Sequence, residues 1–335
     1  MQEPLVSILI PFKNTSEFLS ECIDSILAQT YKNWEVIAID DQSSDNSKAI
    51  MDQFAKDDSR IHVHTNKGTG IIEALRLAYS LCKGSYITRM DSDDIMVPKK
   101  ISLMLETLIA HGKGHLALGK VKYFCDGEIG DGYYKYEKWL NRLTKTGTNF
   151  TELYKECTIP SPCWMVHRSD FEKCGSFHPN RYPEDYDLAF RFYQHGLKCL
   201  PCNEVLHFWR DYDYRASRTS EHYAQNFFLE IKLHYFLKLS YREYRPLVIW
   251  GAGKKGKNLA QKLLSKKIDF HWICNNPKKN GKEIYGKELH HFRFLNQLEK
   301  PQVIITVANN EAQNFIRDHL NELQLRSLEN YYFFC

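Results

Sequence analysis

The sequence predicts an α/β protein built on a mostly parallel sheet. Short apolar, β-prone runs alternate with longer segments in which apolar residues recur at helical spacing. Two of the apolar runs end in clustered carboxylates, one at Asp40 and Asp41 and the other at Asp91, Asp93 and Asp94. Because the carboxyl ends of parallel strands meet at one edge of a sheet, both acidic groups are expected to flank a ligand site there.

The N-terminal elements follow one another in a regular order. Residues 6–12 form a buried apolar run whose end is marked by a proline, and Thr15 and Ser16 are candidate caps for the helical pattern that follows. A turn rich in serine and aspartate at 42–47 precedes a further helical segment. The expected strands are 6–12, 34–41, 61–64 and the run that leads to Asp91, and the expected helices include 15–29, 71–82 and 99–111.

The acidic segment after the fourth strand points to a divalent cation. Carboxylates crowded at a strand end repel one another unless a cation or hydrogen-bond donors share the site. Mg²⁺ and Mn²⁺ prefer such oxygen ligands and leave coordination positions open for substrate phosphates. Asp94 is expected to cap the helix over 99–111 or to hold contacts behind the site, since Pro98 comes next.

Four motifs together resemble the signatures of family 2 glycosyltransferases, which have a GT-A fold. They occur in the family's order over roughly residues 4–220 and comprise residues 11–14, 40–45, 90–94 and 183–188. The resemblance implies a metal-dependent, inverting transfer of a sugar from a nucleotide donor, with Mn²⁺ or Mg²⁺ as cofactor. UDP-sugars are the default donor in such enzymes.

The resemblance also implies roles for single residues. Asp41 and Asp91 would contact the nucleotide, and Asp93 would bind the metal. Asp185 would be the general base, with Glu184 orienting either Asp185 or the acceptor. Two structural alternatives stay open: a carboxylate after the second strand can cap the turn at 42–47, and acids in the first turn of a helix are stabilised by the helix dipole.

Further donor-side candidates lie in the flanking segments. Pro11 belongs to the first motif, and Lys67 and Arg89 flank the expected nucleotide pocket, although either can also pair with nearby acids. Arg210 and Arg218 are candidates to bind the diphosphate, and Arg215 lies in the same segment. Tyr212 stands in the place of a histidine that many family members have.

Trp164 lies in the region that corresponds to the family's acceptor side. An exposed tryptophan there would stack on a sugar face, whereas a buried one would only pack.

A second α/β unit is expected after residue 245. The predicted organisation is a GT-A domain over 1–221, a helical linker over 222–245 and a small Rossmann-like domain over 246–335. Gly251, Gly253 and Gly256 follow a strand and open a helix, as in a dinucleotide fingerprint, but Asn275 stands where an acidic residue is usual. An NAD-binding oxidoreductase or a nucleotide-sensing module is therefore the alternative of another class.

Apolar runs and net charge bear on where the protein is located and on what its acceptor is. No apolar run reaches the ~20 residues that a membrane span needs, so a cytoplasmic protein is expected, with peripheral association at the inner face of the membrane left open. The resemblance to family 2 glycosyltransferases implies a glycan or lipid-linked glycan for surface polysaccharide as the acceptor. Residues 246–335 hold 14 lysines and arginines against 8 aspartates and glutamates, a net charge of +6. This tail also resembles a subgroup that includes a queuosine-tRNA galactosyltransferase, which makes a modified tRNA base the alternative acceptor.

Overall fold

The computed structural model describes residues 3–215, 218 and 225–335, which form two compact units. The first unit comprises residues 1–150 and 158–223, and the second comprises 151–157 and 224–335. The segment 151–157 thus belongs with the second unit although it lies within the sequence of the first. A short 3-10 helix, Asn149–Glu152, spans the point where the chain passes between them.

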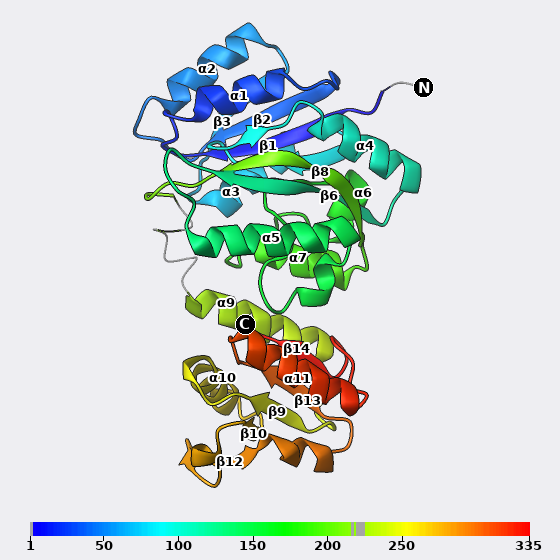
Figure 1. Ribbon diagram of the computed structural model, residues 1–335. Helices are drawn as coiled ribbons and strands as arrows, with labels where there is room; N and C mark the ends of the chain where they lie inside the picture. Colours follow the sequence, from blue (N-terminus) through cyan, green and yellow to red (C-terminus); the bar gives the residue numbers. More distant parts are fainter. Residues whose placement is uncertain (1–2, 216–217, 219–224) are drawn as a thin grey trace. The chain divides into compact units, whose positions relative to one another are not determined.

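The first unit is built on an eight-stranded mixed sheet with the order β3-β2-β1-β4-β7-β6-β8-β5 (Figure 1). The four strands β3, β2, β1 and β4 are parallel, β7 runs antiparallel to both of its neighbours, and β8 is parallel to β6. The strands are β1 Val6–Phe12, β2 Trp34–Asp40, β3 Ile61–Thr65, β4 Tyr86–Arg89, β5 Ile95–Met96, β6 His115–Phe124, β7 Trp164–His167 and β8 Lys198–Arg210.

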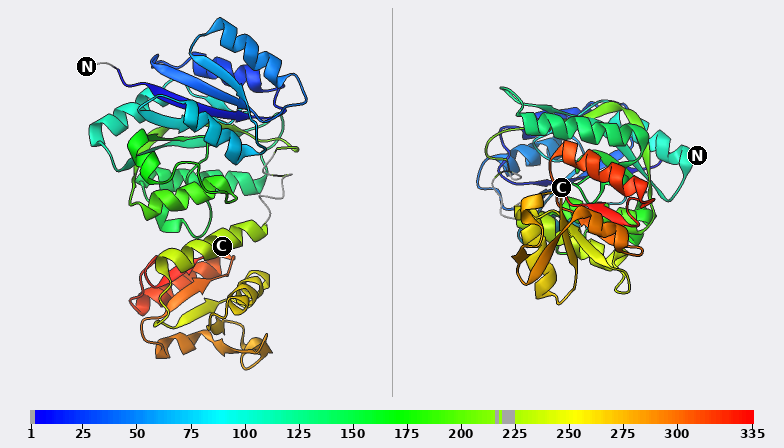
Figure 2. Two further views of the ribbon diagram at one scale, coloured as in Figure 1. Left: turned by 180° about the vertical axis from the view of Figure 1, so that it is seen from behind. Right: turned by 60° about the horizontal axis from the view of Figure 1, so that its bottom comes forward.

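Helices cover both faces of this sheet. Helices α1 and α2 lie over one face and α3 lies on the other, as the two opposite views show (Figures 1 and 2). The helices are α1 Leu19–Leu27, α2 Ser47–Asp57, α3 Ile71–Leu81, α4 Lys100–His111, α5 Asp131–Thr146, α6 Arg168–Lys173 and α7 Glu184–Gln194. The predicted α/β class with a mostly parallel sheet is confirmed.

The start of α1 differs from the sequence expectation. The helix begins at Leu19, its N-terminal flanking residue is Phe18, and no side chain caps it. Thr15 instead accepts the backbone N–H groups of Phe18 and Leu19 through its carbonyl oxygen, at 3.0 Å each. The backbone therefore forms the turn that the side chains of Thr15 and Ser16 were expected to form.

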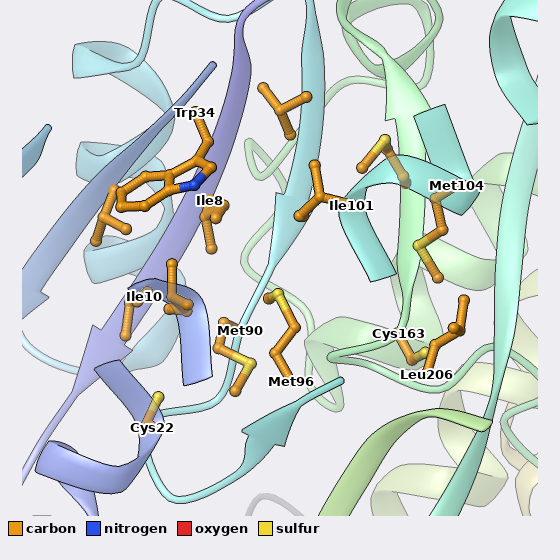
Figure 3. Packing of buried hydrophobic residues seen from close by; sticks show 14 of the residues in the cluster. Ile8, Ile10, Cys22, Trp34, Met90, Met96, Ile101, Met104, Cys163 and Leu206 are labelled. Carbon is orange, nitrogen blue, oxygen red and sulfur yellow. The ribbon is translucent and has the colours of Figure 1, made fainter. Parts of the chain in front are cut away.

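The hydrophobic core fixes the acidic segment at both of its ends. Ile8 and Ile10 of β1 pack in the same cluster as Trp34 of β2 (Figure 3). Met90 and Met96 belong to this cluster too and are at most 1% exposed, so they anchor the backbone immediately before and after residues 91–95. The positions of the carboxylates are thus set by a packed core rather than by a free loop.

The second unit has a six-stranded sheet with the order β11-β12-β10-β9-β13-β14, in which only the β11–β12 pair is antiparallel. The parallel order of β12, β10, β9, β13 and β14 is that of a small Rossmann-like unit. The strands are β9 Leu247–Trp250, β10 His271–Cys274, β11 Glu283–Ile284, β12 Lys287–His291, β13 Gln302–Ile305 and β14 Tyr331–Phe333.

The helices of the second unit are α9 Gln225–Tyr235, α10 Lys254–Ser265 and α11 Asn310–Glu322, together with a π-helical turn at Phe236–Ser240 and 3-10 turns at Pro277–Lys279 and Phe292–Gln297. Throughout the part of the chain that the structure describes, no helix is long and apolar enough to cross a membrane.

Candidate active site

The carboxyl ends of the parallel strands bring the two predicted acidic groups to one edge of the sheet. Strand β1 lies between β2 and β4, so Asp41 after β2 and Asp91 after β4 follow the strands on either side of it. The backbone N–H of Asp41 donates to the carbonyl of Phe12 at the end of β1 (2.8 Å). This is the arrangement that the sequence predicted.

Asp41 holds the loop over residues 66–70. Its carboxylate accepts the backbone N–H of Gly70 at 3.0 Å and the side-chain amide of Asn66 at 2.7 Å, and the ammonium of Lys13 lies 3.6 Å away. The turn at 42–47 is capped by Asp40, which accepts the N–H of Ser43 at 2.9 Å. The capping alternative therefore applies to Asp40 rather than to Asp41.

The other two donor-side candidates of this region differ in exposure. Lys67 projects from the 66–70 loop and is exposed, whereas Pro11 is buried within β1 opposite Ile39 of β2. The predicted parts of Pro11 and Lys67 in donor binding stay predictions.

Arg89 joins the acidic segment to the N-terminus of α7. Its guanidinium is 6% exposed and lies 2.8 Å from a carboxylate oxygen of Asp91 and 2.9 Å from one of Glu184. Burial opposes ionisation of Asp91, but the charges of Arg89, Arg215 and His207 together with the hydrogen bond from Arg89 lower the pKa of that carboxyl. The sequence left open whether Arg89 reads the donor or pairs with acids, and the structure shows the pairing.

Asp185 follows Glu184 in the first turn of α7, as the sequence predicted. Its carboxylate accepts the adjacent backbone N–H of Tyr186 at 2.7 Å. Burial and the neighbouring charge of Glu184 raise the pKa of Asp185 to about 7, while Arg89 opposes the shift. A carboxylate with a pKa near neutral pH suits a general base, because about half of it is ionised at pH 7 and it is basic enough to accept a proton.

Asp93 and Asp94 have different surroundings. Burial and the nearby charge of Asp94 raise the pKa of Asp93 to about 7, against the opposing charge of Arg215. Asp94 is fully buried and accepts the imidazole Nε2 of His207 and the backbone N–H of Arg210, both at 2.8 Å. The second expectation for Asp94, contacts behind the site, is thus the one observed.

The expectation that Asp94 caps the helix after Pro98 is wrong. The residue that flanks the N-terminus of α4 is Lys99, and it makes no side-chain cap. Strand β8 pairs with β5 and brings His207 opposite Met96, so a partner more than a hundred residues away takes the carboxylate instead.

Two of the candidate arginines, at the end of β8 and after it, are paired with acidic side chains. Arg210 is held by Glu21, and its guanidinium lies over the rings of Phe18 and Phe124 at 4.6 and 4.4 Å. Arg218 pairs with two aspartates of its own segment, at 2.7 and 3.2 Å. Both are thus engaged by protein groups.

Arg215 is the arginine that faces the acidic segment. It is 8% exposed, and the charges of Asp94, Asp93 and Asp91 raise its pKa against the effect of burial. The sequence noted Arg215 but favoured its two neighbours for the diphosphate. Nothing in the local sequence of this segment indicates which of the three arginines faces the acidic residues.

Trp164 does not serve as an exposed stacking surface. It lies in β7, is 2% exposed, and packs against Phe171 and Phe192 with ring centroids 5.8 Å away in both cases. The interpretation of Trp164 as an acceptor-binding residue is therefore wrong, because the antiparallel insertion of β7 into the sheet buries its side chain.

The donor set around Asp93 fits a hard divalent cation that is bound together with substrate. Among the described residues, no group of three or more histidine, cysteine, aspartate or glutamate side chains has the geometry of a complete metal site. Asp91 and Asp93 offer carboxylate oxygens, and Mg²⁺ or Mn²⁺ commonly takes one or two carboxylates and completes its shell with phosphates and water. Asp91 and Asp93 are therefore compatible with a Mg²⁺ or Mn²⁺ ion that is bound together with the donor's phosphates.

The glycine loop of the second unit has a structural explanation. A Cβ on Gly256 would lie 2.0 Å from the carbonyl oxygen of Gly251, so the close approach of α10 to β9 requires glycine. The loop borders a hollow of about 400 Å³ lined in part by Lys254, Lys257 and Lys279. Asn275, in the position where a dinucleotide site usually has an acid, accepts the indole N–H of Trp250 at 2.6 Å.

The family is established by comparison with known proteins. The model of the family described as "Glycosyl transferase family 2" matches residues 7–175, which is half of the chain and includes three of the four motifs, so the chain belongs to this family. The crystal structure of S. aureus TarS 1–349 in complex with UDP-GlcNAc has a similar fold, with a TM-score of 0.54 over 77% of this chain and 71% of that one, at 15% identity.

Two curated relatives are similar over shorter segments. Glycosyltransferase GlyG of Streptococcus pneumoniae is 45% identical over 106 residues, which are 31% of this chain and 34% of GlyG. The Escherichia coli protein WfgD, named a UDP-Glc:alpha-D-GlcNAc-diphosphoundecaprenol beta-1,3-glucosyltransferase, is 37% identical over 110 residues, 32% of this chain and 43% of its own. The matched segments thus span less than half the length of either relative.

Proposed function

We propose that this protein is an inverting, metal-dependent glycosyltransferase that moves a sugar from a UDP-linked donor to a hydroxyl of a glycan or lipid-linked glycan. The observation that carries the proposal is the bridge from Asp91 through Arg89 to Glu184, next to Asp185. This bridge joins the acidic strand end, where the donor's diphosphate would lie, to Glu184, and the pKa of the adjacent Asp185 is raised to about 7.

The chemistry follows from the two parts of the site, the base Asp185 at the start of α7 and the acidic segment around Asp93. Asp185 takes the proton of the acceptor hydroxyl, and the hydroxyl oxygen forms a bond to the anomeric carbon while the bond to the diphosphate oxygen breaks. A single displacement of this kind inverts the anomeric centre. A divalent cation held by Asp93 and the diphosphate would neutralise the charge that develops on the leaving group. The buried positive charge of Arg215 acts in the same direction.

The substrate class is supported by the relatives' names. WfgD is named for a UDP-glucose donor and a diphosphoundecaprenol-linked acceptor, and TarS was solved with UDP-GlcNAc. A lipid-linked acceptor would place the enzyme at the inner face of the cytoplasmic membrane as a peripheral protein. A modified tRNA base is the competing acceptor, and the +6 charge of residues 246–335 is the observation that favours it.

A nucleotide-release screen tests this proposal. Purified protein is incubated with UDP-glucose, UDP-galactose, UDP-GlcNAc or GDP-mannose, with Mn²⁺ or with EDTA, and with a diphosphoundecaprenol-linked sugar or with tRNA. We expect UDP release that needs the metal and rises with the lipid-linked acceptor. Stimulation by tRNA alone would select the other acceptor, and metal-independent turnover would contradict the metal role.

A pair of variants separates the transferase from a dinucleotide enzyme. Asp93→Ala is expected to abolish UDP release. Gly253→Ala is the control in the second unit, because a Cβ at Gly253 meets no atom within 4 Å and the φ angle there is −86°. Loss of activity in Gly253→Ala together with NAD binding by the full chain would favour the oxidoreductase instead.

Transfer is expected to depend on pH with an apparent pKa near 7. Burial raises the pKa of Asp185 to about 7, and the base acts in its ionised form, so turnover is full above that pH and falls as the pH is lowered. One unit below the pKa about one tenth of the carboxyl groups are ionised, so turnover should drop about tenfold per pH unit below pH 6. The measurement is turnover between pH 5 and 8 at saturating donor, metal and acceptor; a rate that stays constant down to pH 5 would contradict it.

A further inference from the structure

The segment after β8 lies against the start of α1 through a series of side-chain contacts. We call residues 211–215 the strap. The ring of Tyr212 lies 4.9 Å from that of Phe18, and the hydroxyl of Tyr214 donates to a carboxylate oxygen of Glu17 at 2.6 Å. Arg210, just before the strap, ion-pairs with Glu21. The strap is thus held against the residues that precede α1 by two contacts, and Arg210 beside it is held on α1 itself.

One of these side chains also reaches the carboxylate of Asp93. The hydroxyl of Tyr212 donates to Oδ2 of Asp93 at 2.8 Å, and Nε of Arg210 donates to the backbone carbonyl of Asp93, also at 2.8 Å. In the described part of the chain, no hydrogen bond to the other oxygen, Oδ1, is formed. One oxygen of the carboxylate is therefore held by the phenol, and the other is left for a ligand.

We propose that Tyr212 is a positioning residue that orients the Asp93 carboxylate for a divalent cation bound together with UDP. The inference rests on the proposed function. A carboxylate that binds a cation through one oxygen needs a donor on the other oxygen to fix its rotation, and such outer partners typically contribute about 10–100-fold to metal affinity.

A second group also acts on Asp93. The positive charge of Arg215 acts on this carboxylate, while the hydrogen bond from Tyr212 holds one of its oxygens in place. The aromatic contact between Tyr212 and Phe18 fixes the ring, so the position of the hydroxyl is set by packing rather than by the bond to Asp93 alone.

Calorimetric titration of Mn²⁺ into the full chain tests the proposal, with and without UDP. Tyr212→Phe keeps the ring and its contact with Phe18 but removes the donor. We expect it to weaken the affinity for Mn²⁺ in the presence of UDP about 10–100-fold. UDP binding in the absence of metal should be unchanged, because among the described residues the hydroxyl of Tyr212 bonds to Asp93 alone.

Tyr214→Phe is the matched control. It removes a hydroxyl from the same strap, but that hydroxyl bonds to Glu17 and the side chain is 61% exposed. It should leave the Mn²⁺ affinity unchanged. Equal losses of Mn²⁺ affinity in both variants would assign the effect to the strap as a whole and overturn the role of Tyr212. Wild-type Mn²⁺ affinity in Tyr212→Phe would also overturn that role. If Asp93→Asn also keeps wild-type affinity, the metal site itself is refuted, which is a separate failure.

Discussion

Replacing Asp185 with asparagine is expected to lower turnover about 10²–10⁴-fold while donor binding is kept. The amide has nearly the same shape as the carboxylate and can still accept the N–H of Tyr186 at its oxygen. It cannot take the proton of the acceptor hydroxyl, so the loss falls on the displacement step. The measurement is turnover with the acceptor found in the nucleotide-release screen, together with UDP affinity in the presence of Mn²⁺.

A second aspartate on the same helix provides the control for this variant. Asp187 is 1% exposed, and its carboxylate is paired with Arg181 and Arg191, each at 2.8 Å. Asp187→Asn should therefore lower the thermal stability more than it lowers turnover per folded molecule, whereas Asp185→Asn should do the reverse. Near-wild-type turnover in Asp185→Asn would remove it from the base role.

The sequence was informative wherever the answer depended on local pattern. The strands ending at Asp40 and Arg89, and the helix that starts at Glu184, were predicted within one or two residues because apolar periodicity and the acidic ends of these elements are local signals. The placement of Asp41 and Asp91 at one edge of the sheet followed from the parallel topology alone, whereas the strand order that puts β2 and β4 on either side of β1 was not predicted.

The errors concern side chains whose environment is set by distant segments. Trp164 is buried because β7 inserts antiparallel between β4 and β6, and Asp94 is taken by His207 because β8 returns beside β5. Neither strand pairing can be predicted from the residues next to Trp164 or Asp94 in the sequence. The bridge through Arg89 has the same origin, since Glu184 lies 95 residues further along the chain.

That bridge is also where a single substitution should destabilise the protein most. Arg89→Met removes the guanidinium but keeps much of its apolar length, and it leaves the carboxylates of Asp91 and Glu184, 15% and 5% exposed, without their shared partner. Breaking a buried ion pair from one side typically costs about 3–5 kcal/mol. We expect a loss of this order in the free energy of unfolding, measured by urea denaturation at pH 8, and turnover should fall with it because α7 is no longer tied to the acidic segment.

The pH dependence of this loss provides an internal check. In the native protein Arg89 lowers the pKa of Asp91, so the pair contributes stability that is present above the ordinary carboxyl pKa and is lost as the pH falls through the lowered one. Without Arg89, the charges of Arg215 and His207 still act on Asp91 but the largest lowering contribution is gone, so the pKa of Asp91 rises and protonation relieves part of the lost pairing. The stability difference between Arg89→Met and the native protein should therefore be smaller at pH 5 than at pH 8. Lys48→Met, which removes an exposed pair with Asp52, should cost under about 1 kcal/mol at either pH; an equally small loss in Arg89→Met would show that the bridge does not hold the two halves of the site together.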